Sequence, residues 1–215
     1  MGHVTEKPIG VLAEKMAEGA KFPDGGMAAG LAGLFATSLC RKSLSRLVSA
    51  HPDALSKSEA DAYAWELEDA AAHFEKLLDK QKEALKALNQ FAKGAAPESD
   101  PPLTEEEIYR QAVSVPAAIA ASASRVLSVA AKLISAAPSE LKSDLGVALH
   151  LLYAAFIGGK LKMNDHFAHA QALDSEFVAK TRRTFQDVED AVSQLVGPGL
   201  ESVWAAIEPK RIEAE

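Results

Sequence analysis

The feature that most constrains this chain is an unbroken helical repeat between Ser56 and Gly94. Ser56-Lys57-Ser58-Glu59 has the serine-to-glutamate spacing of a capping box, which marks a helix start. At about 1.5 Å per residue, the helix that follows would be on the order of 50 Å long and would set the length of the domain. Its apolar residues recur at intervals of three, four and seven positions: Tyr63, Leu67, Phe74, Leu78, Leu85 and Leu88.

The rest of the chain also favours helices, so we predict one all-α domain over residues 1–215, a bundle of long, mostly antiparallel helices. The 48% hydrophobic content is rich in Ala and Leu and poor in aromatic residues, which suits close-packed helices. Gly30 and Gly33 lie on one helical face, where another backbone could approach closely. The other helices are expected near residues 9–19, 27–49, 104–138, 139–159, 160–172, 175–196 and 200–207, and Thr104 to Glu107 repeats the capping-box spacing.

Prolines and glycines mark the expected interruptions. Pro116 lies inside a helical pattern and should kink or divide that helix, because proline removes a backbone donor. Gly197-Pro198-Gly199 should separate the last two helices. The segment 94–103 contains three prolines and is expected to be a mobile loop.

Charge and cysteine content narrow the location and the partners. A net charge of −7 argues against a nucleic-acid partner, so any anionic ligand must be held by local cations. The longest apolar run, Val147 to Ile157, is expected to be a buried helix, since it is shorter than the roughly 20 residues that span a bilayer, and no export signal is visible. Cys40 is the one cysteine and suits a reducing compartment, which predicts a cytoplasmic protein without a membrane partner.

Histidines and the cysteine give weak indications of chemistry. His166 and His169 are three residues apart beside Asp165, but they lack an acid at a defined metal-binding spacing, so we expect solvent-exposed side chains and no metal. His150 lies in an apolar run and is expected in the core. Cys40 next to Arg41 could be reactive, although a small buried thiol is the commoner case.

Four segments in order resemble the cyclodeaminase/cyclohydrolase family of folate one-carbon enzymes. The first is the turn Pro23-Asp24-Gly25-Gly26-Met27, which is followed by an Ala/Gly-rich helix like the segment that opens the family. The others are Val115-Pro116 inside a helix, the segment from Ser143-Asp144 to Ala148, and Asp174 to Phe177. Together with matching helix lengths, they extend the resemblance over most of the chain.

The resemblance implies a homodimeric helical domain that binds a tetrahydrofolate derivative. Family members either hydrolyse a 5,10-methenyl bridge or cyclise a formimino group with loss of ammonia, and both reactions need an acid/base group and a backbone-lined cradle. The resemblance assigns the acid/base role to Asp144. Its substrate-binding residues would be Pro23, Asp24, Gly25, Gly26, Met27, Ser143 and either Lys162 or Asn164.

Several positions depart from the family pattern. Asp24 replaces a glycine and Met27 a serine, and the lysine cluster after the second helix is missing. The acid of the long helix is either displaced to Asp79 or lost to Gln81. The family's asparagine pair corresponds either to Lys162 and His166 or, with a two-residue insertion, to Asn164 and Ala168.

These departures leave three questions open at the level of sequence. Asp144 is either a partly desolvated acid/base group or a solvated carboxylate that stabilises a helix dipole. Asp24 either repels the glutamate end of a folate or caps the second helix. The chain is accordingly either a divergent folate enzyme or a non-catalytic, dimeric relative that binds a ligand or acts as a scaffold.

Overall fold

The computed structural model describes residues 3–95, 102–170 and 173–207, and these residues form helices and no strand. The predicted all-α bundle is therefore confirmed. The predicted loop 94–103 lies mostly outside the described residues, so its mobility stays a prediction. The elements are η1 (Val4–Glu6), α1 (Ile9–Ala17), α2 (Gly25–Ala50), α3 (Lys57–Phe91), α4 (Glu105–Ala136), α5 (Ser139–His169) and α6 (Ser175–Ile207).

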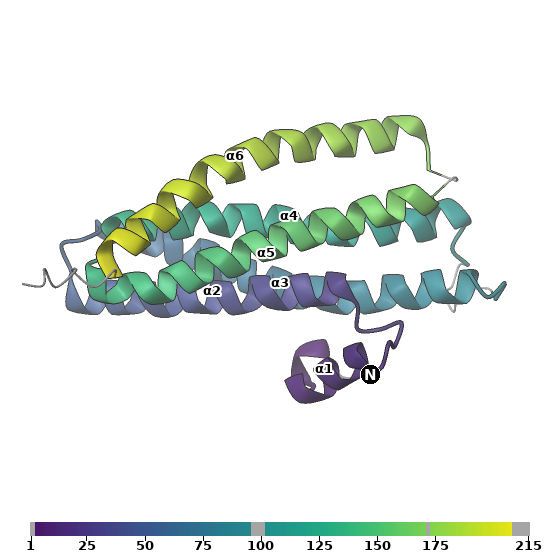
Figure 1. Ribbon diagram of the computed structural model, residues 1–215, viewed down its shortest axis with the longest axis horizontal. Helices are drawn as coiled ribbons and strands as arrows, with labels where there is room; N and C mark the ends of the chain where they lie inside the picture. Colours follow the sequence, from purple (N-terminus) through teal and green to yellow (C-terminus); the bar gives the residue numbers. More distant parts are fainter. Residues whose placement is uncertain (1–2, 96–101, 171–172, 208–215) are drawn as a thin grey trace, which may run out of the picture.

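Four long helices, α2 to α5, lie side by side in alternating directions and form the body of the bundle (Figure 1). α6 packs on α4 and α5 along one side, whereas α1 lies on the opposite side (Figure 1), where its Leu12 packs with Met27 of α2 and Leu78 of α3. The core is built from apolar residues of all five long helices, with Phe74 and Phe156 among its largest fully buried side chains. The short connections between α2 and α3 and between α4 and α5 favour antiparallel neighbours.

Both capping boxes form as the sequence predicts. Ser56 Oγ accepts from the Glu59 N–H at 3.3 Å, and Glu59 accepts from the Ser56 N–H at 2.9 Å. At the start of α4, the hydroxyl of Thr104 accepts from the Glu107 N–H at 3.3 Å, while Glu107 accepts from the Thr104 N–H at 2.8 Å. Each box satisfies two backbone donors that a helix end would otherwise leave free.

At three places where the sequence indicates a break, the helix is not divided. α4 continues through Pro116, α5 continues through Gly159 to His169, and α6 continues through Gly197-Pro198-Gly199. In α6 the carbonyl that Pro198 leaves without a donor belongs to the exposed Gln194, where water can replace the lost bond. In α4 the residues around Pro116 are buried on the neighbouring helices, and this packing outweighs one lost hydrogen bond.

Several helical glycines are packing positions rather than breaks. A Cβ at Gly159 would lie 2.6 Å from the Pro116 carbonyl oxygen, so α5 and α4 approach through a residue without a side chain. Gly30 and Gly33 were expected to admit a neighbouring backbone, but the space beside them is filled by the Leu78 and Phe74 side chains of α3. At Gly33 an added Cβ would meet the Phe74 ring at 2.4 Å.

The amino-terminal segment docks through its own small apolar cluster. Val4 and Leu12 pack with Met27 and Leu78, all of them buried. η1 is also tied to α3, because the Val4 N–H donates to Asp79 Oδ1 at 2.9 Å. This segment therefore covers the start of α2 and the middle of α3.

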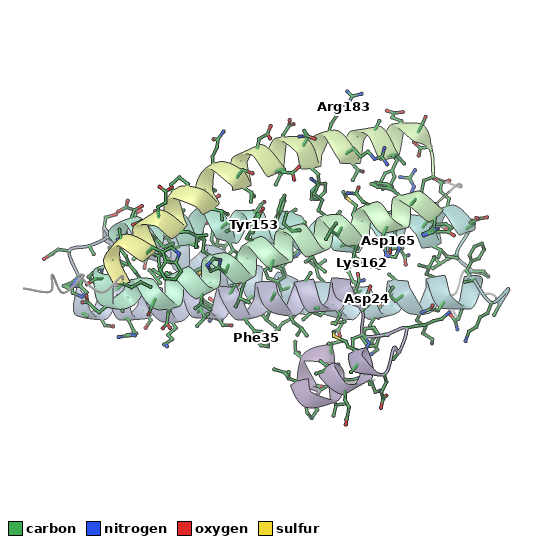
Figure 2. The ribbon with its side chains drawn as sticks, viewed as in Figure 1. Asp24, Phe35, Tyr153, Lys162, Asp165 and Arg183 are labelled. Carbon is green, nitrogen blue, oxygen red and sulfur yellow. The ribbon has the colours of Figure 1, made fainter. Side chains whose placement is uncertain are left out.

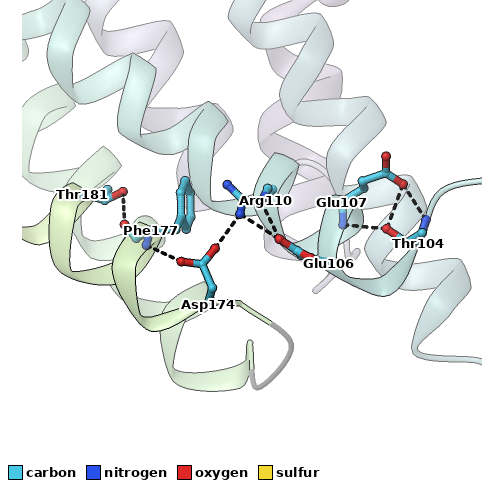
Figure 3. A network of polar contacts seen from close by, with 7 residues as sticks. All are labelled: Thr104, Glu106, Glu107, Arg110, Asp174, Phe177 and Thr181. Atoms are coloured by element: carbon cyan, nitrogen blue, oxygen red, sulfur yellow. Dashed lines mark hydrogen bonds and ion pairs between the residues drawn. The ribbon is translucent and has the colours of Figure 1, made fainter.

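A polar network fixes the beginning of α6 on α4 (Figure 3). Arg110 Nη2 lies 2.6 Å from Asp174 Oδ2 and 2.7 Å from Glu106 Oε1. Asp174 Oδ1 accepts from the Phe177 N–H at 2.6 Å, and the Arg110 guanidinium lies 4.5 Å from the Phe177 ring centroid. The family-like segment from Asp174 to Phe177 therefore has a structural role, as the cap and anchor of α6.

By length and composition, α4 and α5 are also apolar enough to cross a membrane, a test that core helices of soluble proteins pass as well. In the most apolar windows, 56% of α4 residues and 44% of α5 residues are buried inside the bundle. The predicted burial of the run Val147 to Ile157 holds for one face only, since Val147 and Tyr153 are exposed. His150, expected in the core, is exposed as well, because it lies on that same outer face.

Candidate functional site

The turn that resembles the family begins α2, and Asp24 is its N-cap residue. Asp24 Oδ1 accepts a hydrogen bond from the Met27 N–H at 3.1 Å, so the carboxylate satisfies one of the free donors of the helix end. The cap alternative for Asp24 is thus correct. Pro23, Gly26 and Met27 are buried around it, and the Phe22–Pro23 peptide is cis.

Gln81 of α3 reaches the same carboxylate from the neighbouring helix. Its Nε2 lies 3.3 Å from Asp24 Oδ1, and the residue is only 1% exposed. A Cβ on Gly26 would be 2.5 Å from this Nε2, so only glycine leaves room for the amide. Of the two candidates for the family's acidic position on the long helix, Gln81 is therefore the one beside the turn.

α5 contributes a lysine between two carboxylates. Lys162 Nζ lies 2.7 Å from Asp165 Oδ2 and 3.7 Å from Asp24 Oδ2. Its aliphatic stem covers the turn, because a Cβ on Gly25 would be 3.6 Å from Lys162 Cδ. Figure 2 shows Asp24, Lys162 and Asp165 gathered where the start of α2 meets the second half of α5.

His166 follows Lys162 by about one helical turn and is 6% exposed, which corrects the expectation that it faces solvent. Burial first, and then the Lys162 ammonium, lowers the pKa of His166 below its ordinary value of 6.5, although Asp165 and Asp24 act in the opposite direction. The imidazole is therefore neutral at neutral pH. His169 and Asn164 are exposed, so Lys162 and His166 are the pair that faces the turn.

We call Asp24, Gln81, Lys162, Asp165 and His166 the turn cluster. It combines a carboxylate at a helix N-terminus, a buried amide, a cation and a neutral imidazole, contributed by three helices. Such groups can orient a polar ligand and accept or donate protons. No group of three His, Cys, Asp or Glu side chains that could hold a metal ion occurs in the part of the chain that the structure describes.

Asp144, the predicted acid/base residue, is at the other end of the α2–α5 contact. Its Oδ2 lies 2.8 Å from Lys42 Nζ. Lys42 is 18 residues beyond Asp24 in α2, which places Asp144 about 27 Å along the bundle from the turn. Ser143 is exposed beside it. Within one chain, the structure does not bring Asp144 and Ser143 to the turn cluster.

Asp79 points away from the turn, toward the amino terminus. It accepts hydrogen bonds from the His3 ring at 2.5 Å and from the Val4 N–H at 2.9 Å. Burial alone would raise the pKa of Asp79, but these two hydrogen bonds, together with the charges of His3 and Lys82, lower the pKa below the ordinary value of 3.8. Asp79 is thus a charged docking group for η1.

The comparison with protein families bears on this arrangement directly. The sequence model of the formiminotransferase-cyclodeaminase family matches residues 8–187, which include every residue of the turn cluster. The chain belongs to the formiminotransferase-cyclodeaminase family.

Comparison with solved structures agrees in fold. The chain is similar to the crystal structure of formiminotetrahydrofolate cyclodeaminase from Thermotoga maritima, with a TM-score of 0.72 and 19% sequence identity. The similarity covers 95% of this chain and 98% of the other. A search of curated proteins returned no match.

In this member of the formiminotransferase-cyclodeaminase family, a basic groove adjoins the turn. Its cavity of about 360 Å³ is lined by Phe22, Lys82, Lys86, Asn89, Gln90 and Lys93. Phe22 precedes the turn by one residue, and Lys82 follows Gln81 in α3. The three lysines recur at helical spacing on α3, which is the signal in the sequence that points to this groove.

Proposed function

We propose that this chain binds a tetrahydrofolate derivative at the turn cluster and acts on its one-carbon unit, by cyclising a formimino group or hydrolysing a methenyl bridge. One observation carries the proposal: the family's opening turn is the place where buried polar side chains of α2, α3 and α5 converge. Buried polar groups that converge at one place are typical of ligand sites.

The charges near the turn suit a folate. The carboxylate of Asp24 is engaged as a helix cap and lies near Lys162, which offsets the repulsion that its charge would exert on a folate glutamate. The groove with Lys82, Lys86 and Lys93 supplies the local cations that a chain of net charge −7 needs to hold an anionic tail. We propose that the glutamate end lies in this groove.

A homodimer forms part of the proposal. Apolar side chains remain exposed on the outer faces of α2 and α5: Phe35 is 41% exposed, Val147 52% and Leu161 63%. These are positions that a twofold, self-complementary contact would bury. We propose a second copy of this chain as the occupant of this face.

Such a dimer would bring Asp144 of one subunit close to the turn cluster of the other. Asp144 and Lys162 are 18 residues apart in α5, which is about five helical turns, so they lie on the same side of that helix. A twofold axis that crosses α5 midway between them, near Tyr153, would bring the partner subunit's Asp144 toward Lys162. In this arrangement the partner subunit's Asp144 serves as the acid/base group.

The second candidate function is a non-catalytic, dimeric relative that binds a ligand or acts as a scaffold. The pairing of Asp144 with Lys42 and of Asp79 with His3 favours it, because both predicted acids have structural partners. In either case we propose a cytoplasmic protein without a nucleic-acid or membrane partner. This rests on the net charge, the apolar pattern and the lone cysteine.

Calorimetry with tetrahydrofolate and its methenyl and formimino derivatives tests the proposal. Binding of at least one of them supports a folate site, and absence of binding at millimolar ligand removes it. Loss of the methenyl absorbance, or release of ammonia from the formimino derivative, then separates the enzyme from the binding relative. Asp187→Asn, an exposed change in the middle of α6, is the matched control.

A further inference from the structure

Three buried polar atoms in the turn cluster have no hydrogen-bond partner. They are Asp24 Oδ2, Gln81 Oε1 and His166 Nε2. Among the described residues, the one other buried side-chain atom without a hydrogen-bond partner is Ser43 Oγ, which lies 19 residues beyond Asp24 in α2. Buried polar atoms in native proteins are nearly always paired. Three in one cluster therefore indicate a ligand group that completes them.

The chemistry of these atoms specifies what they require. A carboxylate oxygen and an amide oxygen can only accept hydrogen bonds, and Nε2 of a neutral imidazole accepts in one tautomer. Lys162 does not satisfy Asp24, because its Nζ is 3.7 Å from Oδ2 and donates to Asp165 at 2.7 Å instead. The cluster thus presents acceptors to a group that donates.

The charge of the cluster points the same way. Asp24 and Asp165 carry two negative charges against one positive charge on Lys162, and His166 is neutral, so one negative charge remains. The helix N-terminus does not attract an anion here, since Asp24 Oδ1 already occupies it. The site therefore favours a donor group with one positive charge over a carboxylate or a phosphate.

We infer that Asp24, Gln81 and His166 form a binding site for an N–H donor group of the amidine class. The identity of the molecule that carries this group rests on the proposed function. A folate offers the group in two places: the amino-pyrimidinone edge of the pterin ring, and the formimino group, which is an amidine and is cationic when protonated. Gly26 is part of the site, because a side chain there would displace the Gln81 amide.

The test is calorimetry of the full chain with formiminotetrahydrofolate and with tetrahydrofolate, repeated on Asp24→Asn and Gln81→Met. Asp24→Asn keeps the oxygen that caps α2 and removes the charge, whereas Gln81→Met keeps the volume and removes the amide. We expect at least a tenfold loss of affinity in each variant, and no loss in the Asp187→Asn control. Loss confined to the formimino ligand assigns the site to that group, and equal loss for both ligands assigns it to the pterin edge.

Unchanged affinities in both variants would overturn the inference. The partner of these three atoms would then be a buried water. If the wild-type protein binds no folate, the proposed function fails, and formamidinium chloride then tests the site alone. The measurement is the rise in Tm that formamidinium chloride causes, relative to sodium chloride at equal ionic strength. A larger rise for the wild-type protein than for Asp24→Asn supports the site. Equal protection of the two proteins overturns it.

Discussion

Asp24 and Gln81 are joined by a hydrogen bond across the α2–α3 interface, from Gln81 Nε2 to Asp24 Oδ1 at 3.3 Å. The same oxygen caps α2 through the Met27 N–H. One carboxylate oxygen thus connects the start of one helix to the middle of another, while the second oxygen has no hydrogen bond. Oδ1 of Asp24 therefore stabilises the fold, and Oδ2 is the oxygen that we propose to bind a ligand.

Asp24→Ala should lower the free energy of unfolding by about 1 kcal/mol, the usual cost of losing a helix cap. For a chain of this length that corresponds to a fall in Tm of roughly 3 °C. Asp24→Asn, which keeps an acceptor oxygen, should lie closer to wild type. Thermal unfolding followed by circular dichroism measures both, and an Asp24→Ala protein with unchanged Tm would show that the cap contributes nothing.

Gly159→Ala should destabilise the bundle by about 1–3 kcal/mol, because the new methyl group would be forced against backbone. Its Cβ would lie 2.6 Å from the Pro116 carbonyl oxygen and 3.0 Å from the Ala120 nitrogen. Gly10→Ala is the matched control, since nothing lies within 4 Å of a Cβ there. In urea unfolding, Gly159→Ala should have a lower free energy of unfolding than wild type. Gly10→Ala should have an equal or higher one, because alanine favours the helix more than glycine.

Docking of the amino-terminal segment should depend on pH through His3 and Asp79. The hydrogen bond to Asp79 raises the pKa of His3 above 6.5, and the pKa of Asp79 is lowered below 3.8. The His3 contribution is fully present below 6.5 and is lost as pH rises through its folded pKa. The Asp79 contribution is present above 3.8 and is lost as pH falls through its folded pKa. Docking is therefore strongest between the two folded pKa values.

Hydrogen exchange of residues 4–12, corrected for intrinsic rates, measures this dependence. Protection should be greater at about pH 5 than at about pH 9, which lie on the two sides of the ordinary His pKa. His3→Gln should abolish the loss of amide protection at high pH and leave the protection of the rest of the bundle unchanged. A wild-type profile that is flat across this range would contradict the assignment.

Cys40 should resist thiol reagents in the folded protein. Burial raises its pKa to about 12, so almost no thiolate is present at neutral pH, and the side chain is inaccessible. Labelling should follow the rate of unfolding and reach one thiol per chain in urea. Fast stoichiometric labelling of the native protein would return Cys40 to consideration as a nucleophile.

The proposed dimer predicts a scattering mass of twice 22.8 kDa at micromolar concentration. Val147→Glu should shift the population toward the monomer, because it places a charge in the proposed apolar contact. Trp204→Glu, at an exposed position on α6, is the control and should leave the mass unchanged. A monomeric wild-type mass would exclude both the dimer and the contribution of the partner subunit's Asp144.

The sequence by itself determined the fold class, the capped ends of α3 and α4, and the family. These depend on local signals: a 3.6-residue periodicity, the spacing of a serine or threonine cap to a glutamate, and the order of short motifs. Local signals failed where packing outweighs propensity. α5 continues through Gly158-Gly159 because these glycines admit Ala29 of α2 and the Pro116 carbonyl of α4. Gly199 remains helical in α6, packed against Leu149 of α5.

Only the tertiary structure decided which side chains share a site. The relative register of α2, α3 and α5 brings Gln81, Lys162 and His166 to Asp24 from 57 residues or more away in the sequence, and it places Asp144 about five helical turns from them. That register is set by close contacts such as Gly33 against Phe74. These two residues belong to different helices, so the helical periodicity of the sequence does not relate them. The sequence therefore indicates each of these residues separately, and the packing of the helices determines which of them meet.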